Sequence, residues 1–456
     1  MNNTINKEKL LSELEEKCSL IAARINLPDK EKETKLKKTF RNCFMDTAER
    51  TLMLPGEVSK DALGNEKVVS DEIFMITGDI NAMWLRDSAA QVKHYIPFEN
   101  SCPEVKKLIE SLIRRQCDCI IRDPYANSFL EWSEARSMWE GDECDMVSGD
   151  WERKYETDSL SYHLLLIDVH VKSTGDLSVL SEKEAKAIEA ILTVLETETK
   201  HDQSPYFFRR SKADGTYSGI PCDGHGTPIG YTGMTWTGFR PSDDVCTYGY
   251  NIPENLFVAK ALESITTMYT LLKDSGKETA KDFEKLSKRA SGLKETILKG
   301  IEDFGIVERE GYGKVYAYET DGLGNHLLMD DANIPSLLSL PYFGIASRGD
   351  ELYENTRRFI LSKDNPFFYK GSFAKGIGSP HTPDGNIWPM SLIMQGLTST
   401  DEKERMDLLH TLLNTDNECF AMHESFNPDL PSDYTRFWFA WADSLFAEFV
   451  ATIFND

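Results

Sequence analysis

The feature of this sequence that most limits its fold is the recurrence of apolar residues at helical spacing. Leu10, Leu14, Cys18 and Ile21 fall on one face of a helix, and the same spacing returns along the whole chain. These stretches predict about a dozen helices. They lie near 36–44, 105–113, 154–173, 182–200, 251–274, 278–300, 349–363, 386–397, 402–415 and 434–454, with weaker candidates at 82–96 and 331–340.

Strand signals are confined to a few places. Residues 56–77 predict a hairpin that turns at 63–65, and residues 307–318 predict another that turns at 311–313. The sequence has no alternation of strands with helices, no Gly-x-Gly-x-x-Gly and no Walker A motif, so nucleotide binding by those routes is not expected. The pattern favours one large all-α domain over residues 1–456, with a few short β-hairpins in its loops.

The balance of charge excludes two classes of partner. The chain has 51 lysines and arginines against 75 aspartates and glutamates, a formal net charge of −24. Non-specific binding to nucleic acid or to an anionic membrane requires a cationic surface, so neither partner is expected. An acidic surface that keeps the protein in solution accounts for most of this charge.

The cysteines and the N-terminus bear on the compartment. The nine cysteines form no Cys-x-x-Cys, and no His-Glu-x-x-His is present, so neither a metal nor another cofactor is expected. An odd number of thiols in a large chain is typical of a reducing cytoplasm. No signal peptide is visible, and Asp443 and Glu448 interrupt the most apolar stretch, 437–454. We expect a cytoplasmic protein; a monomer is expected, although the sequence does not specify the oligomeric state.

The loops between the predicted helices mix aromatic and charged residues, which is typical of functional loops. The first, 77–88, contains Trp84, Arg86 and Asp87. An indole ring can stack on the apolar face of a sugar while a fixed arginine and aspartate bind adjacent hydroxyls. The competing interpretation is a structural ion pair at the start of a helix.

A second cluster, 131–158, carries three tryptophans among many charges. It fits a ring around a pocket, and it fits packing between helices nearly as well. Within it, 155–159 can equally be the acidic first turn of a helix.

The third loop, 232–244, ends in Asp243 and Asp244. Paired aspartates favour acid–base chemistry, because mutual repulsion and burial raise one pKa. The competing interpretation is an N-cap for the following helix, supplied by Ser242 or an aspartate. The sequence does not say which aspartate does which.

Three more loops of this type follow, at 329–335, 379–389 and 422–428. In the last, Glu424 next to His423 could activate a water molecule, although an isolated His–Glu pair more often lies on the surface by chance and has no function. Such loops, without a nucleophilic serine or cysteine motif, indicate a pocket for a polyol. Hydrolysis of a glycosidic bond requires two carboxyl groups, one to protonate the leaving oxygen and one to activate water or attack the sugar.

Four of these blocks, at 78–88, 238–244, 329–333 and 423–426, together resemble glycoside hydrolase family 125. The resemblance extends over nearly the whole chain, in order. It implies an (α/α)6 barrel, or toroid, and an inverting exo-α-1,6-mannosidase with an aspartic acid as general acid, a glutamate as general base and no metal. Matched by motif, the acid is Asp243 or Asp244 and the base is Glu424. The residues then expected to bind substrate are Trp84, Arg86, Asp87, Arg240, Asp330, Asp331, Asn333, His381 and His423.

The resemblance implies removal of terminal mannose from α-1,6-linked manno-oligosaccharides such as N-glycan fragments. Inversion needs room for a water, so the catalytic carboxyls should stand roughly 6.5–9.5 Å apart, and the pKa of the acid should be raised. The rival functions are another (α/α)6 glycosidase, such as a glucoamylase-like α-glucosidase or an unsaturated glucuronyl hydrolase, a phosphorolytic variant, and a non-catalytic sugar-binding relative. No role is assigned to residues 200–230.

Overall fold

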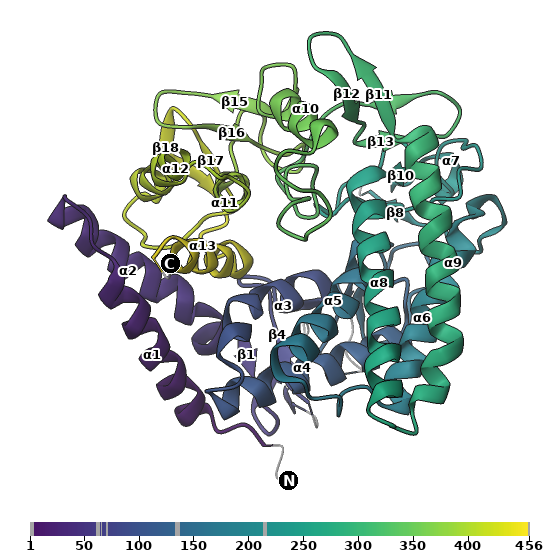
Figure 1. Cartoon of the computed structure of the whole chain (residues 1–456), viewed down its shortest axis with the longest axis horizontal. Coiled ribbons are helices and arrows are strands. Elements are labelled where there is room, and N and C mark those ends of the chain that lie inside the picture. Colours follow the sequence, from purple (N-terminus) through teal and green to yellow (C-terminus); the bar gives the residue numbers. More distant parts are fainter. Residues whose placement is uncertain are drawn as a thin grey trace.

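The computed structural model describes residues 4–60, 64, 66–69, 72–132, 137–212 and 217–454. Helices dominate this part of the chain (Figure 1). Their bounds are α1 Lys7–Arg24, α2 Lys30–Asp46, α3 Leu85–Gln91, α4 Pro103–Arg122, α5 Thr157–Thr174, α6 Glu182–Glu198, α7 Pro221–Gly224, α8 Ile252–Asp274, α9 Ala280–Phe304, α10 Glu351–Ile360, α11 Pro389–Leu397, α12 Glu402–Thr415 and α13 Ala440–Phe454. Short non-α turns are η1 Thr47–Thr51, η2 Lys93–Phe98 and η3 His201–Gln203.

The helices form two concentric rings, the (α/α)6 toroid that the sequence resemblance implied. In the inner ring α3 packs against α5 and α13, α5 packs against α8, and α11 packs against α13. In the outer ring α1 contacts α2 and α4, α4 contacts α6, and α6 contacts α9, while α12 contacts α2. The C-terminal α13 lies beside the N-terminal α2, so the two ends of the chain close the ring (Figure 1).

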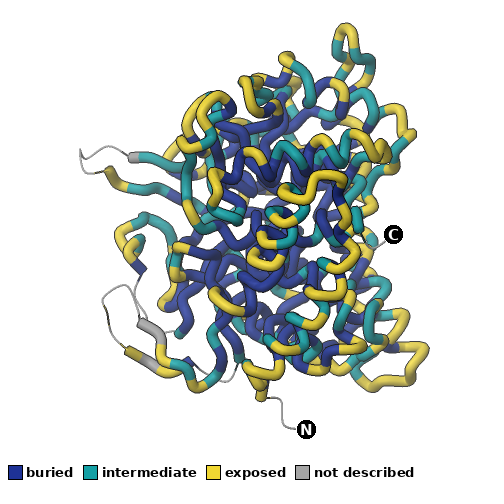
Figure 2. Tube along the Cα trace, turned by 90° about the vertical axis from the view of Figure 1, so that its left-hand side faces the viewer, coloured by how far each residue is buried: buried dark blue, intermediate teal, exposed yellow. Residues whose placement is uncertain are grey.

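Apolar stripes at helical spacing explain the packing. The stripe predicted in α4 is fully buried, from Val105 through Leu112 and Ile113. Side-chain caps begin several of the helices: Asp29 accepts hydrogen bonds from the first turn of α2, and Asn251 caps α8. The buried residues fill the interior between the helices (Figure 2). No helix in the described ranges has both the length and the apolar character needed to cross a membrane.

One place in the inner ring has no helix. The predicted helix at 331–340 is wrong: turns and bends occupy this segment. It still packs inward, since Phe343 lies against Phe257 of α8 and the Tyr162 hydroxyl of α5 donates to the Ile334 carbonyl oxygen. The physical reason is the buried Asp330 carboxylate, which accepts from the backbone N–H groups of residues 337 and 338 and so replaces helical hydrogen bonds.

Two other helix predictions needed correction at their ends. The segment 434–454 is helical only from Ala440, because β18 and a connecting loop occupy its first residues. The weak candidate at 82–96 is divided into the short α3 and η2. The first correction moves Phe437, Trp438 and Phe439 out of a helix and into a loop.

The strands are short and antiparallel, and they lie in the loops. The two predicted hairpins are confirmed as β2–β3 and β11–β12, although Leu63 and Asn65 of the first turn lie outside the described residues. The described pairs are β1 Leu52–Met53 with β4 Phe74–Met75, β2 Val58–Lys60 with β3 Glu66–Val68, β8 Arg209–Ser211 with β9 Tyr217–Gly219, β11 Ile306–Arg309 with β12 Gly313–Tyr316, β15 Phe368–Lys370 with β16 Lys375–Ile377, and β17 Ser425–Asn427 with β18 Leu430–Thr435. Two sheets have three strands: β5 Met83–Trp84, β6 Ser128–Phe129 and β7 Asp150–Glu152, and β10 Tyr250–Asn251, β13 Glu319–Thr320 and β14 His326–Leu327.

Candidate active site

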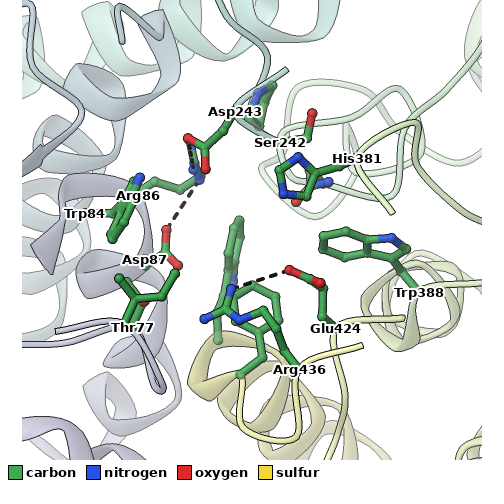
Figure 3. Close-up of a pocket in the computed structure, with 15 residues that line it drawn as sticks. Thr77, Trp84, Arg86, Asp87, Ser242, Asp243, His381, Trp388, Glu424 and Arg436 are labelled. Carbon is green, nitrogen blue, oxygen red and sulfur yellow. Dashed lines mark hydrogen bonds and ion pairs between the residues drawn. The ribbon is translucent and has the colours of Figure 1, made fainter. Parts of the chain in front are cut away.

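A pocket opens where inner-ring helices begin (Figure 3). Trp84, Trp388 and Phe439 immediately precede α3, α11 and α13. The residues that line it are Thr77, Ile80, Trp84, Arg86, Asp87, Pro241, Ser242, Asp243, Asn333, His381, Trp388, Glu424, Arg436, Phe439 and Trp441.

Arg86 organises the acidic wall of this pocket. Its guanidinium is buried in the first turn of α3 and donates to Glu156 Oε2 at 2.6 Å and to Asp158 Oδ2 at 3.2 Å. The neighbouring Asp87 faces the pocket, with Oδ2 3.5 Å from Arg86 Nε. Burial raises the pKa of Asp87 to about 6, even though the charge of Arg86 opposes the shift.

Asp243 and Asp244 have different surroundings. A turn in which Asp243 N–H donates to the Arg240 carbonyl oxygen holds Asp243 at φ 68°, and its side chain lines the pocket. The Asp244 side chain instead accepts from Ser242 Oγ at 3.1 Å and lies 3.3 Å from His381 Nδ1. Although burial acts to lower it, this carboxylate raises the pKa of His381 to about 9, so His381 is a cation at neutral pH. Of the two aspartates, only Asp243 is among the residues that line the pocket.

The expectation that the acid itself has a raised pKa is not met by Asp243. Burial favours its neutral form, but Lys154, a hydrogen bond with Glu156 and Arg86 together hold the pKa of Asp243 below its ordinary range. The pKa of Glu156 is shifted in the opposite direction, because complete burial raises it well above its ordinary value. The two carboxyls interact directly, so the proton of the pair belongs on Glu156.

Glu424 is presented from the opposite wall by the β17–β18 hairpin (Figure 3). Ser425 pairs with Thr435 at the end of the antiparallel ladder. Glu424 and Arg436 are the next residues beyond this pair, so they lie opposite each other. Arg436 Nη1 lies 3.4 Å from Glu424 Oε1, and its Nη2 lies 2.5 Å from Asp79 Oδ1. Arg436 therefore fixes the orientation of a carboxylate that is itself largely buried.

The structure brings seven of the predicted residues to the pocket: Trp84, Arg86, Asp87, Asp243, Asn333, His381 and Glu424. Arg240, Asp330, Asp331, Asp244 and His423 are not among the lining residues. Each of these has a local role, described next.

The residues outside the pocket support its walls. Arg240 donates to Glu319 Oε1 at 2.6 Å, and Asp331 accepts from the backbone and side-chain amides of Asn333. Asp330 holds the non-helical segment described above, and burial raises its pKa to about 8. The His423 ring stacks on Tyr434, with ring centroids 3.7 Å apart. The predicted sugar contact by His423 has no geometric support.

Sequence reasoning missed Arg436, Phe439 and Trp441, which complete the pocket beside Glu424. The signal that could have found them is the mixture of arginine and aromatic residues in 434–441, the same signal that identified the other loops. It was hidden because this segment was assigned to a helix. In the part of the chain that the structure describes, no three His, Cys, Asp or Glu side chains are grouped as a metal ion would need.

The helical toroid, with a pocket lined by aromatic residues and by carboxylates on opposite walls, defines the chain as a glycoside hydrolase. The sequence matches the family of metal-independent α-mannosidases, GH125, over residues 33–451. The chain belongs to this family, which confirms the resemblance seen in the sequence.

Individual relatives agree with this assignment. The Meiotically up-regulated gene 157 protein of Schizosaccharomyces pombe is 37% identical over 433 residues, covering 91% of this chain and 81% of that protein. A metal-independent α-mannosidase of Streptococcus pneumoniae, solved in a non-productive complex with α-1,6-mannobiose, is 37% identical with a TM-score of 0.88, covering 97% of this chain and 98% of that chain. A wild-type glycosidase at 13% identity and TM-score 0.51, covering 94% and 99% of the two chains, shares the fold alone.

Proposed function

We propose that this α-mannosidase is an exo-acting enzyme that hydrolyses terminal α-1,6-linked mannose with inversion of configuration. The observation that carries the proposal is the placement of Asp243 and Glu424 on opposite walls of one pocket (Figure 3). A pocket, as opposed to an open groove, suits removal of a single terminal sugar. The α-1,6-mannobiose bound by the S. pneumoniae relative supports the linkage and the manno-oligosaccharide substrate.

In the proposed mechanism Asp243 is the general acid and Glu424 the general base. Asp243 protonates the glycosidic oxygen as its bond to the anomeric carbon breaks. Glu424, oriented by Arg436, removes a proton from the water that attacks the opposite face of that carbon. The two carboxyls should then stand roughly 6.5–9.5 Å apart in the substrate complex. Asp87 and Arg86 are proposed to bind hydroxyls, and the tryptophans to stack on the ring.

The test is a comparison of matched disaccharides. We expect release of mannose from α-1,6-mannobiose, with much slower release from the α-1,2 and α-1,3 isomers and no glucose from isomaltose. Proton NMR during the first turnovers should show β-mannose, the inverted anomer. Initial formation of α-mannose would refute inversion, and glucose release would favour the glucoamylase-like alternative.

The base assignment has its own test. Glu424→Gln keeps the size of the side chain but cannot accept a proton, so kcat for α-1,6-mannobiose should fall by about 10²–10⁴-fold. Calorimetric binding of the disaccharide should be largely retained. Asp244→Asn, on the neighbouring aspartate that does not line the pocket, should reduce kcat far less than Asp243→Asn. Near-wild-type turnover by Glu424→Gln would contradict the mechanism.

We also propose a monomeric cytoplasmic enzyme that acts on N-glycan fragments. The nine cysteines are free, which supports a reducing compartment. Light scattering after size exclusion measures the oligomeric state, and fractionation of the source cells measures the location. Activity on reducing-end-tagged N-glycan fragments, read by mass spectrometry, tests the natural substrate.

A further inference from the structure

The acidic wall of the pocket carries more carboxyl groups than its central cation can compensate. Arg86 lies 2.6 Å from Glu156, 3.2 Å from Asp158, 3.5 Å from Asp87 and 3.9 Å from Asp243. If all four were ionised, Arg86 would face four negative charges in a site that is largely closed to water, and the further cations Lys154, His381 and Arg436 act mainly on Asp243 and Asp87. Unpaired buried charge is strongly unfavourable, so this cluster must retain a proton.

Of the two carboxyls Glu156 and Asp243, Glu156 is the better position for that proton. Its side chain is 0% exposed, whereas that of Asp243 is 22% exposed. Around Glu156 the ionisable neighbours are Arg86, Lys154, Asp158 and Asp243, with Glu254 beyond the Thr157 hydroxyl. The charge of Lys154 acts most strongly on Asp243, and His381 lies on that side as well.

Glu156 and Asp243 are also in direct communication. The Asn127 side-chain amide donates to Glu156 Oε1 and to Asp243 Oδ1, each at 3.1 Å, and so holds the two carboxyls together. Each carboxyl also acts directly on the pKa of the other. Asp243 is the member that reaches the pocket, while Glu156 lies behind it on the protein side.

We propose that Glu156 is a positioning residue that stores the catalytic proton and passes it to Asp243 when a mannoside fills the pocket. This inference rests on the proposed role of Asp243 as general acid. A bound sugar displaces water from the partly exposed Asp243, which penalises its charged form and moves the shared proton toward it. The acid arm of the site is then a relay of two carboxyl groups.

The reaction steps account for each proton and for the electron pair of the broken bond. Glu156 loses its proton to the neighbouring Asp243 and becomes a carboxylate beside Arg86. Asp243 then gives the proton to the glycosidic oxygen, which keeps the electron pair of the broken bond and leaves as a hydroxyl. Water adds to the anomeric carbon and loses a proton to Glu424. Solvent exchange after product release removes that proton from Glu424 and restores the one on Glu156.

The test compares two leaving groups in Glu156→Gln. Gln fills the same space and can still accept from Arg86, but it has no proton to transfer. Hydrolysis of α-1,6-mannobiose, whose leaving alcohol needs protonation, should fall by about 10²-fold or more. Hydrolysis of α-mannosyl fluoride, whose leaving group needs little protonation, should fall by less than about fivefold. Equal losses on both substrates, or unchanged hydrolysis of mannobiose, would overturn the relay.

Matched variants test the proton relay separately from the assignment of Asp243 as general acid. Asp158→Asn changes another buried carboxyl on Arg86, and it should lower hydrolysis of both substrates by a similar factor. Asp243→Asn should lower hydrolysis of α-1,6-mannobiose far more than hydrolysis of α-mannosyl fluoride. If it does not, the assignment of Asp243 as general acid is wrong. If Asp243→Asn shows this selective loss and Glu156→Gln does not, only the role of Glu156 is refuted. If Glu156→Gln does not fold, Glu156→Asp, whose carboxyl is withdrawn from Asp243, should give a smaller selective loss. Equal loss on the two substrates in Glu156→Asp would also overturn the relay.

Discussion

The carboxyl of Asp443 connects the first turn of α13 to the loop that carries the proposed base. Asp443 Oδ1 accepts from Met422 N–H at 2.7 Å, two residues before Glu424, and from Cys43 Sγ at 3.1 Å. Burial and the nearby charge of Asp46 raise the pKa of Asp443 to about 8. The folded protein therefore keeps a proton on this side chain that the unfolded chain releases above its ordinary pKa of 3.8.

This proton sets a pH dependence of stability. The contribution of Asp443 is fully present below pH 3.8 and is lost as the pH rises toward about 8. Asp443→Asn removes the titration, so its free energy of unfolding relative to wild type should rise by about 1 kcal/mol per pH unit between about pH 5 and pH 7. Urea unfolding across this range measures it. Asp407→Asn, on the exposed face of α12, should follow the wild-type curve; a parallel curve for Asp443→Asn would disprove the assignment.

Single residues could be predicted from the sequence where aromatic and charged residues are contiguous. Trp84, Arg86 and Asp87 meet at the pocket because they occupy the junction between β5 and α3. The choice between Asp243 and Asp244 depends on a turn with positive φ at Asp243, which no residue pattern specifies. Arg436 reaches Glu424 only because β17 pairs with β18, so its role depends on strand register and not on local sequence.

At the scale of elements, the best helix predictions agree with the structure to within a residue, as for α8 and α12, whereas α4 extends nine residues beyond its predicted stripe. The errors lie where side chains compete with helical hydrogen bonds. Asp330 replaces a turn of helix at residues 337 and 338, and the β17–β18 hairpin extends into residues assigned to α13. Strand pairs such as β15–β16 were missed because strands of three residues are too short for alternation to be visible.

The crossing of α11 and α13 depends on a residue without a side chain. A Cβ atom at Gly396 would lie 2.4 Å from Phe449 Cζ and 2.5 Å from Phe449 Cε2. Gly396→Ala should therefore destabilise the protein by about 1–3 kcal/mol through overpacking between these inner helices. The free energy of unfolding in urea measures the change.

The control for this prediction is Gly292 on the exposed face of α9. A Cβ atom there would have no neighbour within 4 Å, so Gly292→Ala should be neutral or stabilising by up to about 1 kcal/mol, because alanine favours the helix. Equal effects of the two substitutions would show that Gly396 does not set the spacing of α11 and α13.

At the scale of the whole molecule, the toroid brings distant parts of the chain to one pocket. Its lining extends from Thr77 to Trp441, and Arg436 is joined to Asp79 across the closure of the ring. The helical period predicted the number and type of elements, but the ring order came from family resemblance. Periodicity gives each helix an apolar face without specifying which neighbour covers it.

The net charge of −24 is a property of the whole molecule, and we expect it to affect stability but not catalysis. Self-repulsion of a highly acidic protein lowers the stability of its compact state, and salt screens this repulsion. The melting temperature should therefore rise between about 20 mM and about 300 mM NaCl, whereas kcat/KM for neutral α-1,6-mannobiose should change by less than about twofold, since a neutral sugar is not steered by the field. Calorimetry and initial rates in the same buffers make the comparison. A steep rise of kcat/KM with salt would mean that repulsion limits access of substrate and would contradict a neutral manno-oligosaccharide as the natural substrate.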